Sequence, residues 1–347
     1  MVLFISACQP DKLSQELHQR QLFTFGTLVD ISILSNDPQQ ARQAIDELST
    51  EFDRLHALWH PWNDGALAQA NRQFSSPVPI TTSPSIISLI QQSQYLSRQS
   101  NGLFNPAIGK LIKLWQFDQL DNEAFQFHLP EAEAIQSLLQ QNPSMEDIII
   151  SQSSSSGEQI HSNNPSVALD FGAFAKGVAI ENMIHQLKKR HIDNALINAG
   201  GDLKVLGSKN GTPWRIGIKN PEYAKNPNAK PVLAAINLRN EESLFTSGDY
   251  ERFFEVEGQH YHHIIDPRSG YPARGTRSVT ILTNDAALAD AASTALFIAG
   301  PEQWSDIARK MGIDHVMLIA ADKHIYLSPA MAERIEFLTA VKPVIIK

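Results

Sequence analysis

Apolar positions along the chain recur at two different spacings, which predict a mixture of strands and helices. In residues 25–34, apolar and polar positions alternate after a glycine, which is typical of a half-buried strand. In residues 38–60, apolar side chains return every three or four positions behind a proline, which predicts an amphipathic helix. Residues 83–102 repeat this pattern, from Ser-Pro at the start to Asn-Gly at the end.

The second half of the chain alternates less regularly between the two patterns. A polar, serine-rich stretch at 151–165 predicts an exposed loop, and 167–190 begins like a strand and ends like a helix. Further strands are predicted for ALIN, WRIGI, AAINL, RFFEV and SVTIL. A last helix is predicted from about 285 to 299, where Gly-Pro stops it. Without a regular βαβ alternation, the fold class is predicted to be α+β.

Length and charge restrict the possible functions. At about 150 residues per domain, 347 residues predict two domains or one large one. The formal charge is −8, from 29 basic and 37 acidic residues, which argues against binding of duplex nucleic acid. No apolar run reaches the 18 residues or so that span a bilayer.

The single cysteine, Cys8, predicts a location for the protein. It closes Ile5-Ser6-Ala7-Cys8, which has the form of a bacterial lipoprotein cleavage site, and an incidental thiol is the alternative. Only seven residues, none of them basic, precede it, which a late start or a trimmed leader explains. We expect residues 1–21 to be a lipoprotein-type leader and tether, and the mature protein to lie on the periplasmic side of the inner membrane in the bacterial cell envelope, anchored by a lipid on Cys8.

The stretch from Asp290 to Thr294 is a candidate cation site. On a helix, positions i and i+4 lie on the same face, so the carboxylate and the hydroxyl point the same way. They lie among apolar and small residues, where an unpaired carboxylate costs several kcal/mol. Either Asp290 is exposed or hydrogen-bonded locally, or it helps to bind a hard cation such as Mg²⁺.

Two other stretches carry candidate chemistry. Lys176 follows a turn with glycines and alanines at the start of a predicted helix, where a lysine is favoured if an anion binds at the same corner. A solvated lysine is the alternative. The stretch YHHIIDPRSGYPA, residues 261–273, contains histidines suited to proton transfer, but by itself it is better explained as a turn.

Together, four ordered motifs resemble the FAD:protein FMN transferase family, also called ApbE. They are ALDFGAFAKG, INAGGDL, TSGDYERFFEVEGQHYHHIIDPRSGYPA and SVTILTNDAALADAASTALFIAG. Upstream, FGT, ALWHPWNDGALAQAN and NGLFNPAIGKLIKLWQF extend the resemblance over about residues 22–330. It implies a T-fold-related arrangement of mixed sheets flanked by helices, with one large transferase domain, 22–347, made of two subdomains.

The resemblance also implies a reaction and the residues that carry it. Members bind FAD with Mg²⁺, cleave its pyrophosphate and attach FMN to a threonine or serine of an acceptor flavoprotein, releasing AMP. Carried onto this sequence, the metal ligands are Ala173, through its carbonyl, Asp290 and Thr294. The catalytic residues are Lys176, His263 as general base and Asp266, which orients the loop or contacts the flavin. The FAD site is formed by Trp62, Asn71, Asp170, Gly172, Lys176, Gly200, Gly201, Asp202, Thr246, Ser247, Gly248, Glu251 and His263.

His262 is not assigned a role, because neighbouring residues of a strand point to opposite faces. The chain departs from the family pattern at His60-Pro61-Trp62, where a serine and a tyrosine are usual, and at Asn105, where an aspartate is usual. Trp62 can still stack on an aromatic ring. Two alternatives remain at this point, an FAD pyrophosphatase that uses water as acceptor and a flavin-binding protein without turnover.

Overall fold

The protein is built around one large sheet that helices cover on one face. Its structure, a computed structural model, describes residues 14–120, 125, 127–154, 157–224, 226 and 228–346. Within these ranges the sheet has nine strands in the order β1-β2-β6-β7-β10-β13-β14-β15-β17, antiparallel throughout except for the β15–β17 pair. Its strands are β1 (Glu16–Thr24), β2 (Thr27–Ser35), β6 (Ala195–Ala199), β7 (Asp202–Leu206), β10 (Ser243–Gly248), β13 (Thr276–Thr283), β14 (His315–Ala320), β15 (Ile325–Leu327) and β17 (Val344–Ile345).

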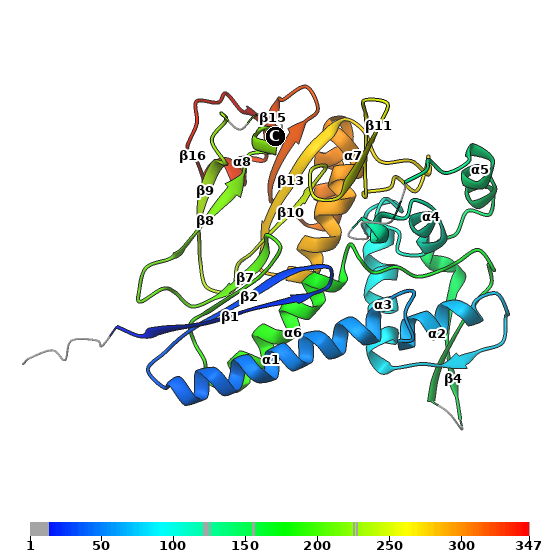
Figure 1. Cartoon of the computed structure of the whole chain (residues 1–347), viewed down its shortest axis with the longest axis horizontal. Helices are drawn as coiled ribbons and strands as arrows, with labels where there is room; N and C mark the ends of the chain where they lie inside the picture. The colour runs from blue at the N-terminus through cyan, green and yellow to red at the C-terminus, as the bar shows by residue number, and fades with distance from the viewer. Residues whose placement is uncertain are drawn as a thin grey trace, which may run out of the picture.

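Three long helices pack on one face of this sheet and form the main core with it (Figure 1). They are α1 (Pro38–Trp59), α6 (Ala175–Lys189) and α7 (Ala286–Met311). The predicted period in α1 is confirmed, since its apolar positions from Ile45 to Trp59 are buried. Asp37 caps this helix by accepting from the amides of Gln39 and Gln40, and Pro38 occupies its first turn.

The other face of the main sheet is covered by a small sheet of order β16-β9-β8. This sheet consists of β8 (Trp214–Lys219), β9 (Val232–Leu238) and β16 (Ile335–Phe337), and the short helices η3 (Pro221–Ala224) and α8 (Pro329–Ala332) flank it. The predicted strands WRIGI and AAINL are thereby confirmed as β8 and β9.

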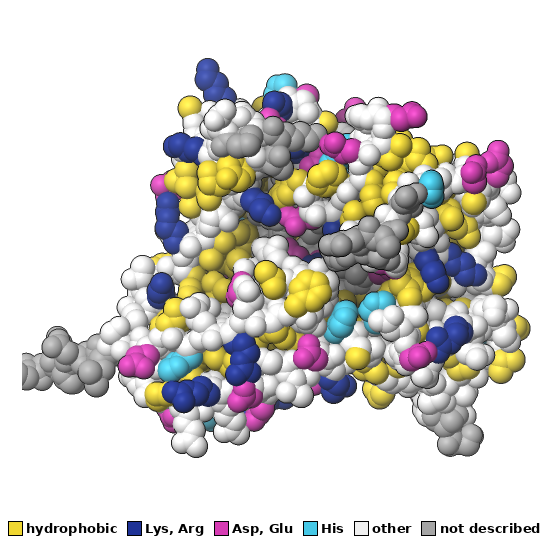
Figure 2. Space-filling model, in the orientation of Figure 1, with side chains coloured by type: hydrophobic (Ala, Val, Ile, Leu, Met, Phe, Trp, Pro, Cys, Tyr) yellow, Lys and Arg dark blue, Asp and Glu magenta, His cyan; other side chains and the backbone are white. Residues whose placement is uncertain are grey.

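A second group of elements lies beside the main sheet (Figure 1). It contains a sheet of order β3-β5-β4 and the hairpin β11-β12. Its elements are α2 (Ala66–Gln73), β3 (Ile80–Thr81), α3 (Pro84–Gln99), α4 (Gly109–Leu114), η1 (Phe117–Gln119), α5 (Ala132–Gln140), η2 (Met145–Asp147), β4 (Ile148–Ser153), β5 (Gly157–Ser162), β11 (Phe253–Val256) and β12 (Gln259–His262). In space-filling view the surface is hollowed near the centre of the face shown, and acidic and basic side chains line this hollow (Figure 2).

The strand-like start of 167–190 forms only an isolated bridge between Ala168 and Ile108, and the structure differs from the sequence-based expectations at three further places. The polar stretch predicted as a loop contains β5, which pairs with β4 and buries Ile160. The last long helix does not stop at Gly300: that residue has φ 73° and ψ −179°, and helix resumes behind Pro301. A glycine adopts this kink without a Cβ clash, and a proline is tolerated in the first turn of the segment that follows.

The third difference concerns the amino-terminal segment. Strand β1 begins at Glu16, inside the segment predicted as a tether up to residue 21. The strand is at the edge of the main sheet and mostly exposed, so its sequence is polar and gives no strand signal. Cys8 and the cleavage motif lie outside the described residues. No helix of the described part is long and apolar enough to cross a membrane.

Candidate active site

Three charged side chains from distant segments meet at one end of the main sheet. Lys176 lies in the first turn of α6, Asp202 begins β7, and Asp290 belongs to α7. The ammonium nitrogen of Lys176 is 3.2 Å from Asp202 Oδ2 and 3.3 Å from Asp290 Oδ1. The backbone amide of Gly177 donates to the other oxygen of Asp290 at 2.8 Å. The fold therefore brings three of the predicted site residues into direct contact.

Burial and charge act on this cluster in opposite directions. Burial alone would lower the pKa of Lys176, but the carboxylates of Asp290 and Asp202 raise it above its ordinary value. Lys176 is therefore a permanent cation. Burial raises the pKa of Asp202 to about 6, and the charge of Lys176 only partly opposes this effect. The site thus holds more negative charge than the single lysine neutralises.

The turn in front of α6 is shaped by two polar side chains. Asp170 Oδ1 accepts a hydrogen bond from the amide of Gly172 at 2.8 Å, and burial raises the pKa of this carboxyl. Asn71 Nδ2 donates to the carbonyl of Leu169 at 2.9 Å, and its Oδ1 accepts from the Leu169 amide at 2.7 Å. The bonds from Asn71, which lies in α2, hold Leu169 against the second group of elements, and Ala173 in the same turn is half-buried. Asn71 is predicted to bind FAD, and in the structure its side chain holds the backbone of this turn in place.

Hydroxyl groups of β10 face α7 and β13 beside the charged cluster. Thr246 donates its backbone amide to Asp202 Oδ1 at 3.0 Å, and its hydroxyl lies 2.9 Å from that of Thr280. Ser247 Oγ lies 2.8 Å from Ser293 Oγ and 3.4 Å from Thr294 Oγ1. Strand β10 therefore faces α7, the helix on which the metal ligands Asp290 and Thr294 are predicted.

The donor set near Asp290 suits a hard divalent cation. The carboxylate of Asp290 and the hydroxyl of Thr294 lie one helical turn apart on α7. The ammonium of Lys176 lies between Asp290 and Asp202, so a cation bound by Asp290 would lie on the side of Thr294 and not between the two carboxylates. No group of three histidine, cysteine, aspartate or glutamate side chains suited to a metal occurs in the described ranges. A cation here would need oxygens from substrate and water, as Mg²⁺ commonly does.

The predicted glycines allow close approach of backbone. Gly200 has φ 67°, and a Cβ on it would lie 2.3 Å from Thr27 Oγ1. Gly201 has φ 109° and donates its amide to Asn198 Oδ1 at 2.9 Å. A Cβ on Gly248 would lie 2.7 Å from the ring of Tyr250. At Gly200 and Gly201, side chains are disfavoured by the backbone conformation itself.

The two adjacent histidines have different surroundings. His262 is buried; its Nε2 donates to the carbonyl of Ala273 at 2.8 Å and its Nδ1 accepts from the amide of Ile264 at 3.2 Å. His263 Nδ1 lies 3.3 Å from the carbonyl oxygen of Arg252, which can only accept, so Nδ1 carries the hydrogen and Nε2 the lone pair. His262 therefore has no nitrogen left for chemistry, whereas the neutral His263 keeps Nε2 for accepting a proton.

His263 lies within electrostatic reach of the charged cluster. Burial lowers its pKa to about 3, and the positive charges of Arg252 and Lys176 act in the same direction. Arg252 itself was not predicted. Its guanidinium donates to the carbonyl of Gly26 at 3.0 Å, so it connects the β1–β2 turn to the histidine loop, residues 261–273, whose His263 bonds to the Arg252 carbonyl. A Cβ on Gly26 would lie 2.5 Å from the guanidinium of Arg252. The need for glycine at this position is therefore the only trace of the contact in the sequence, and it can be interpreted only once the structure is known.

Asp266 closes the turn that follows the histidines. Its carboxylate accepts from Arg268 Nη2 at 2.7 Å and from Arg268 Nε at 2.9 Å, and its carbonyl accepts from the amide of Gly270 at 2.8 Å. Arg268 Nη2 also donates a hydrogen bond to the carbonyl of Ile298 in α7. Of the two roles predicted for Asp266, orientation of the loop fits these contacts, and contact with the flavin stays a prediction.

Two predicted FAD contacts lie toward the periphery of the site. Trp62 is half-buried, and the ammonium of Lys113 lies 4.8 Å from its ring centre. Glu251 is exposed and forms an ion pair with Lys219 at 3.4 Å. The ring of Trp62 and the carboxylate of Glu251 are both accessible to a ligand.

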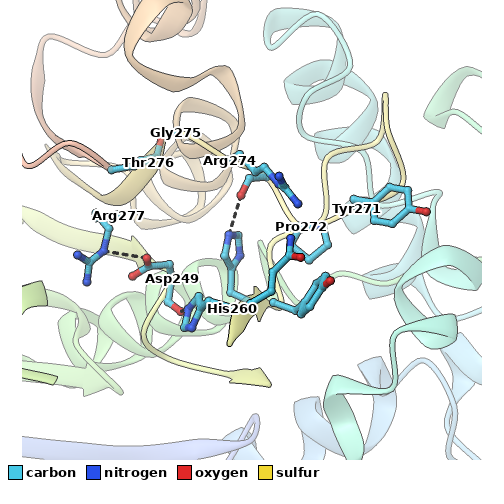
Figure 3. A pocket seen from close by; sticks show the side chains of 13 residues that line it. Asp249, His260, Tyr271, Pro272, Arg274, Gly275, Thr276 and Arg277 are labelled. Carbon is cyan, nitrogen blue, oxygen red and sulfur yellow. Dashed lines mark hydrogen bonds and ion pairs between the residues drawn. The ribbon is translucent and has the colours of Figure 1, made fainter. Parts of the chain in front are cut away.

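A separate pocket of about 240 Å³ is lined in part by residues of the histidine loop (Figure 3). It is lined by Asp249, His260, Tyr271, Arg274 and their neighbours, and by none of the predicted site residues. Arg277 Nε is 2.8 Å from Asp249 Oδ2 in a buried ion pair at its wall. The pocket therefore lies next to the candidate site without being part of it.

Comparison with solved structures places this fold. The crystal structure of the ApbE protein of Thermotoga maritima matches 92% of this chain and 99% of that chain, with a TM-score of 0.80 and 28% identity. The flavin transferase ApbE of Vibrio cholerae matches 92% of this chain and 99% of its own, with a TM-score of 0.77 and 24% identity. The predicted α+β class is confirmed.

Comparison with curated proteins gives the class of activity. A protein of Rhodobacter capsulatus is 38% identical over 90% of this chain, which spans 57% of that relative, and one of Treponema pallidum is 32% identical over 93% and 90%. Both are named FAD:protein FMN transferase. The fold and these relatives thus place the chain among the enzymes of the flavin transferase class. The model of the ApbE family matches residues 25–317, and the chain belongs to that family.

Proposed function

We propose that this enzyme is a Mg²⁺-dependent FAD:protein FMN transferase. It would break the pyrophosphate of FAD, attach the FMN phosphoryl group to a threonine or serine hydroxyl of an acceptor flavoprotein, and release AMP. The observation that carries the proposal is the contact of Lys176 with Asp202 and Asp290, beside the hydroxyls of Ser247 and Thr294. Phosphoryl transfer needs mainly positioning and stabilisation of charge, and this cluster supplies both.

In this reaction the acceptor hydroxyl attacks the phosphorus atom of the FMN half. The bond from that phosphorus to the bridging oxygen breaks, and the bridging oxygen leaves with AMP. Lys176 is fixed at the start of α6, where a cation and the helix end both favour phosphate oxygens. Its buried partners keep it in place, so its charge needs no rearrangement as the reaction proceeds.

His263 accepts the proton of the acceptor hydroxyl at Nε2. Its low pKa keeps the imidazole neutral, and hence able to accept, throughout the physiological pH range. A bound pyrophosphate brings negative charge near the ring, which raises the pKa of His263 toward a value more useful for a base. The carbonyl of Arg252 holds Nδ1–H and thereby fixes the tautomer.

Asp290 and Thr294 would hold Mg²⁺, with the carbonyl of Ala173 as a third protein ligand. The ion supplies charge neutralisation for the pyrophosphate oxygens in this site. The chain's own part is to present few carboxylates at this place, so that coordination positions remain for the substrate.

The direct test incubates the enzyme with FAD, Mg²⁺ and a candidate acceptor protein, and measures the acceptor mass. A gain equal to one FMN phosphoryl group supports transfer. Release of free FMN with no labelled protein would instead identify an FAD pyrophosphatase, and FAD binding without turnover would leave a flavin-binding protein. Either result overturns the proposal.

The variant Asp290→Asn gives a sharper version of this test. The carboxylate lies in the charged cluster and is almost fully buried, so loss of its charge should reduce transfer by about 100-fold or more. The matched control is Asp306→Asn, an exposed aspartate on the same helix, which should keep wild-type rates. Wild-type turnover in Asp290→Asn would remove the metal assignment.

We also propose that Cys8 carries a lipid and holds the enzyme at the periplasmic face of the inner membrane. The support is the motif Ile5-Ser6-Ala7-Cys8 alone. Intact-mass analysis of protein from the membrane fraction tests it, because an acylated Cys8 adds the mass of the lipid. Unmodified protein found only in the soluble fraction would contradict the anchor.

A further inference from the structure

One serine is buried within the alanine-rich part of α7 that carries Asp290 and Thr294. Ser293 is 1% exposed, between residues that are almost all alanine or aliphatic. A buried hydroxyl is costly unless it is hydrogen-bonded, and Ser293 has two partners. Its Oγ lies 2.9 Å from the carbonyl oxygen of Asp290 and 2.8 Å from Ser247 Oγ.

The direction of these hydrogen bonds follows from what each atom can do. A carbonyl oxygen only accepts, so the single hydrogen of Ser293 goes to the carbonyl of Asp290. Ser293 must then accept from Ser247, which uses the hydrogen of Ser247. Toward Thr294, 3.4 Å away, Ser247 has only lone pairs left. The hydrogen of Thr294 is therefore directed to Ser247, and the row of donors runs from Thr294 to Ser247 to Ser293.

The consequence concerns the oxygen of Thr294. With its hydrogen directed to Ser247, its lone pairs are left for another partner. Lone pairs attract a cation and repel a phosphate oxygen, so this orientation makes Thr294 a cation ligand. We propose that Ser293 is a positioning residue, which orients the hydroxyls of Ser247 and Thr294 so that Thr294 presents lone pairs to the metal ion. The inference rests on the proposed function only through the assignment of a metal to Thr294.

The test measures metal binding directly, without FAD and without turnover. In Ser293→Ala the hydrogen of Ser247 is free to turn toward Thr294, which disrupts the orientation. Because loss of an outer partner of a metal ligand typically costs about 10-fold to 100-fold in affinity, we expect at least about tenfold weaker binding of Mn²⁺ or Mg²⁺ by calorimetry. At saturating Mg²⁺, the kcat of Ser293→Ala should return to the wild-type value. The variant should therefore differ from the wild type in the Mg²⁺ concentration that gives half-maximal activity.

Controls separate this role from a packing role. Ser93→Ala removes the hydroxyl of another fully buried helical serine, one with no hydrogen-bond partner in the described part of the chain, and should leave metal affinity unchanged. Asp290→Asn removes the proposed carboxylate ligand and gives the metal affinity expected when the site is lost. Ser247→Ala interrupts the same row at its middle and should weaken metal binding as Ser293→Ala does, even if the latter variant folds poorly.

Metal affinity within twofold of wild type in both Ser293→Ala and Ser247→Ala would overturn the inference, and so would equal losses in Ser93→Ala. Failure of the proposed function is recognised separately. If the wild-type enzyme labels no acceptor while Ser293→Ala still weakens metal binding, the transferase proposal fails and the positioning role of Ser293 stands.

Discussion

The buried histidine beside the proposed base predicts a specific dependence of stability on pH. His262 uses both ring nitrogens in hydrogen bonds to backbone, and burial lowers its pKa from 6.5 to about 4. The variant His262→Gln keeps an amide that can donate to Ala273 but cannot be protonated. At pH 7.5 we expect it to be less stable by about 1–3 kcal/mol, because the amide of Ile264 loses its acceptor.

The sign of the pH effect follows from proton binding. Between the folded pKa of about 4 and the unfolded value of 6.5, the unfolded chain binds the proton and the folded chain does not. Acidification through this window therefore favours unfolding, and the stability of the wild type falls as the pH falls. The loss due to His262 is about 2 kcal/mol at pH 5 and approaches about 3 kcal/mol below pH 4.

Urea unfolding of both proteins at pH 7.5 and pH 5, followed by tryptophan fluorescence, measures the effect as a difference. Other groups titrate in this window too, but they are shared by both proteins and cancel. We expect the wild type's advantage over His262→Gln to shrink by about 2 kcal/mol at pH 5. The control is His128→Gln, at an exposed position. The difference in unfolding free energy between the wild type and this variant should be the same at pH 7.5 and at pH 5. An advantage that stays constant or grows on acidification would refute the reasoning.

Three further predictions concern the proposed chemistry. Lys176→Met leaves two buried carboxylates without their cation, so unfolding experiments should show a loss of about 3–5 kcal/mol, partly recovered by Mg²⁺. In His263→Gln, transfer should fall by about 100-fold or more while FAD binding, measured by calorimetry, persists; lost binding would mean a structural role. Asn71→Ala releases the backbone of Leu169, so the KM for FAD should rise more than kcat falls in steady-state kinetics, and an unchanged KM would contradict this role.

Periodicity predicted the elements whose apolar positions meet one face of the core. Helix α1 is such a case, because its apolar positions from Ile45 to Trp59 are buried and the helix packs against β1, β2, α6 and α2. Strand β1 is the opposite case, since an edge strand exposed along most of its length needs no apolar alternation. The kink at Gly300 could not be predicted from the local sequence, because Gly-Pro normally ends a helix. Here a helix resumes after Pro301, since the next segment packs Trp304 and Ile307 into the same core.

Ordered motifs singled out residues that the fold brings into contact, but they did not predict the hydrogen-bond partners of these residues. Their order in the chain indicated that Lys176 and Asp290 belong together, and the fold confirms the contact across more than a hundred residues. Their partners are contributed by backbone and by neighbouring strands, which residue types do not reveal. The carbonyl of Arg252 selects the tautomer of His263, and Arg268 occupies the carboxylate of Asp266. Both contacts depend on how a loop folds back on itself.

The charge of the cluster explains why a site of this kind would work with a cation. Two carboxylates around one ammonium leave a net negative charge at the place where we propose that the pyrophosphate, itself doubly negative, binds. Lys176 alone therefore cannot make the site attractive to FAD, because its charge is already shared by Asp202 and Asp290. A divalent ion on Asp290 would reverse this balance and free part of the lysine's charge for the phosphate. With Mg²⁺ bound as proposed, metal and FAD would each improve the binding of the other, because the carboxylates that would repel FAD alone would hold the ion that attracts it.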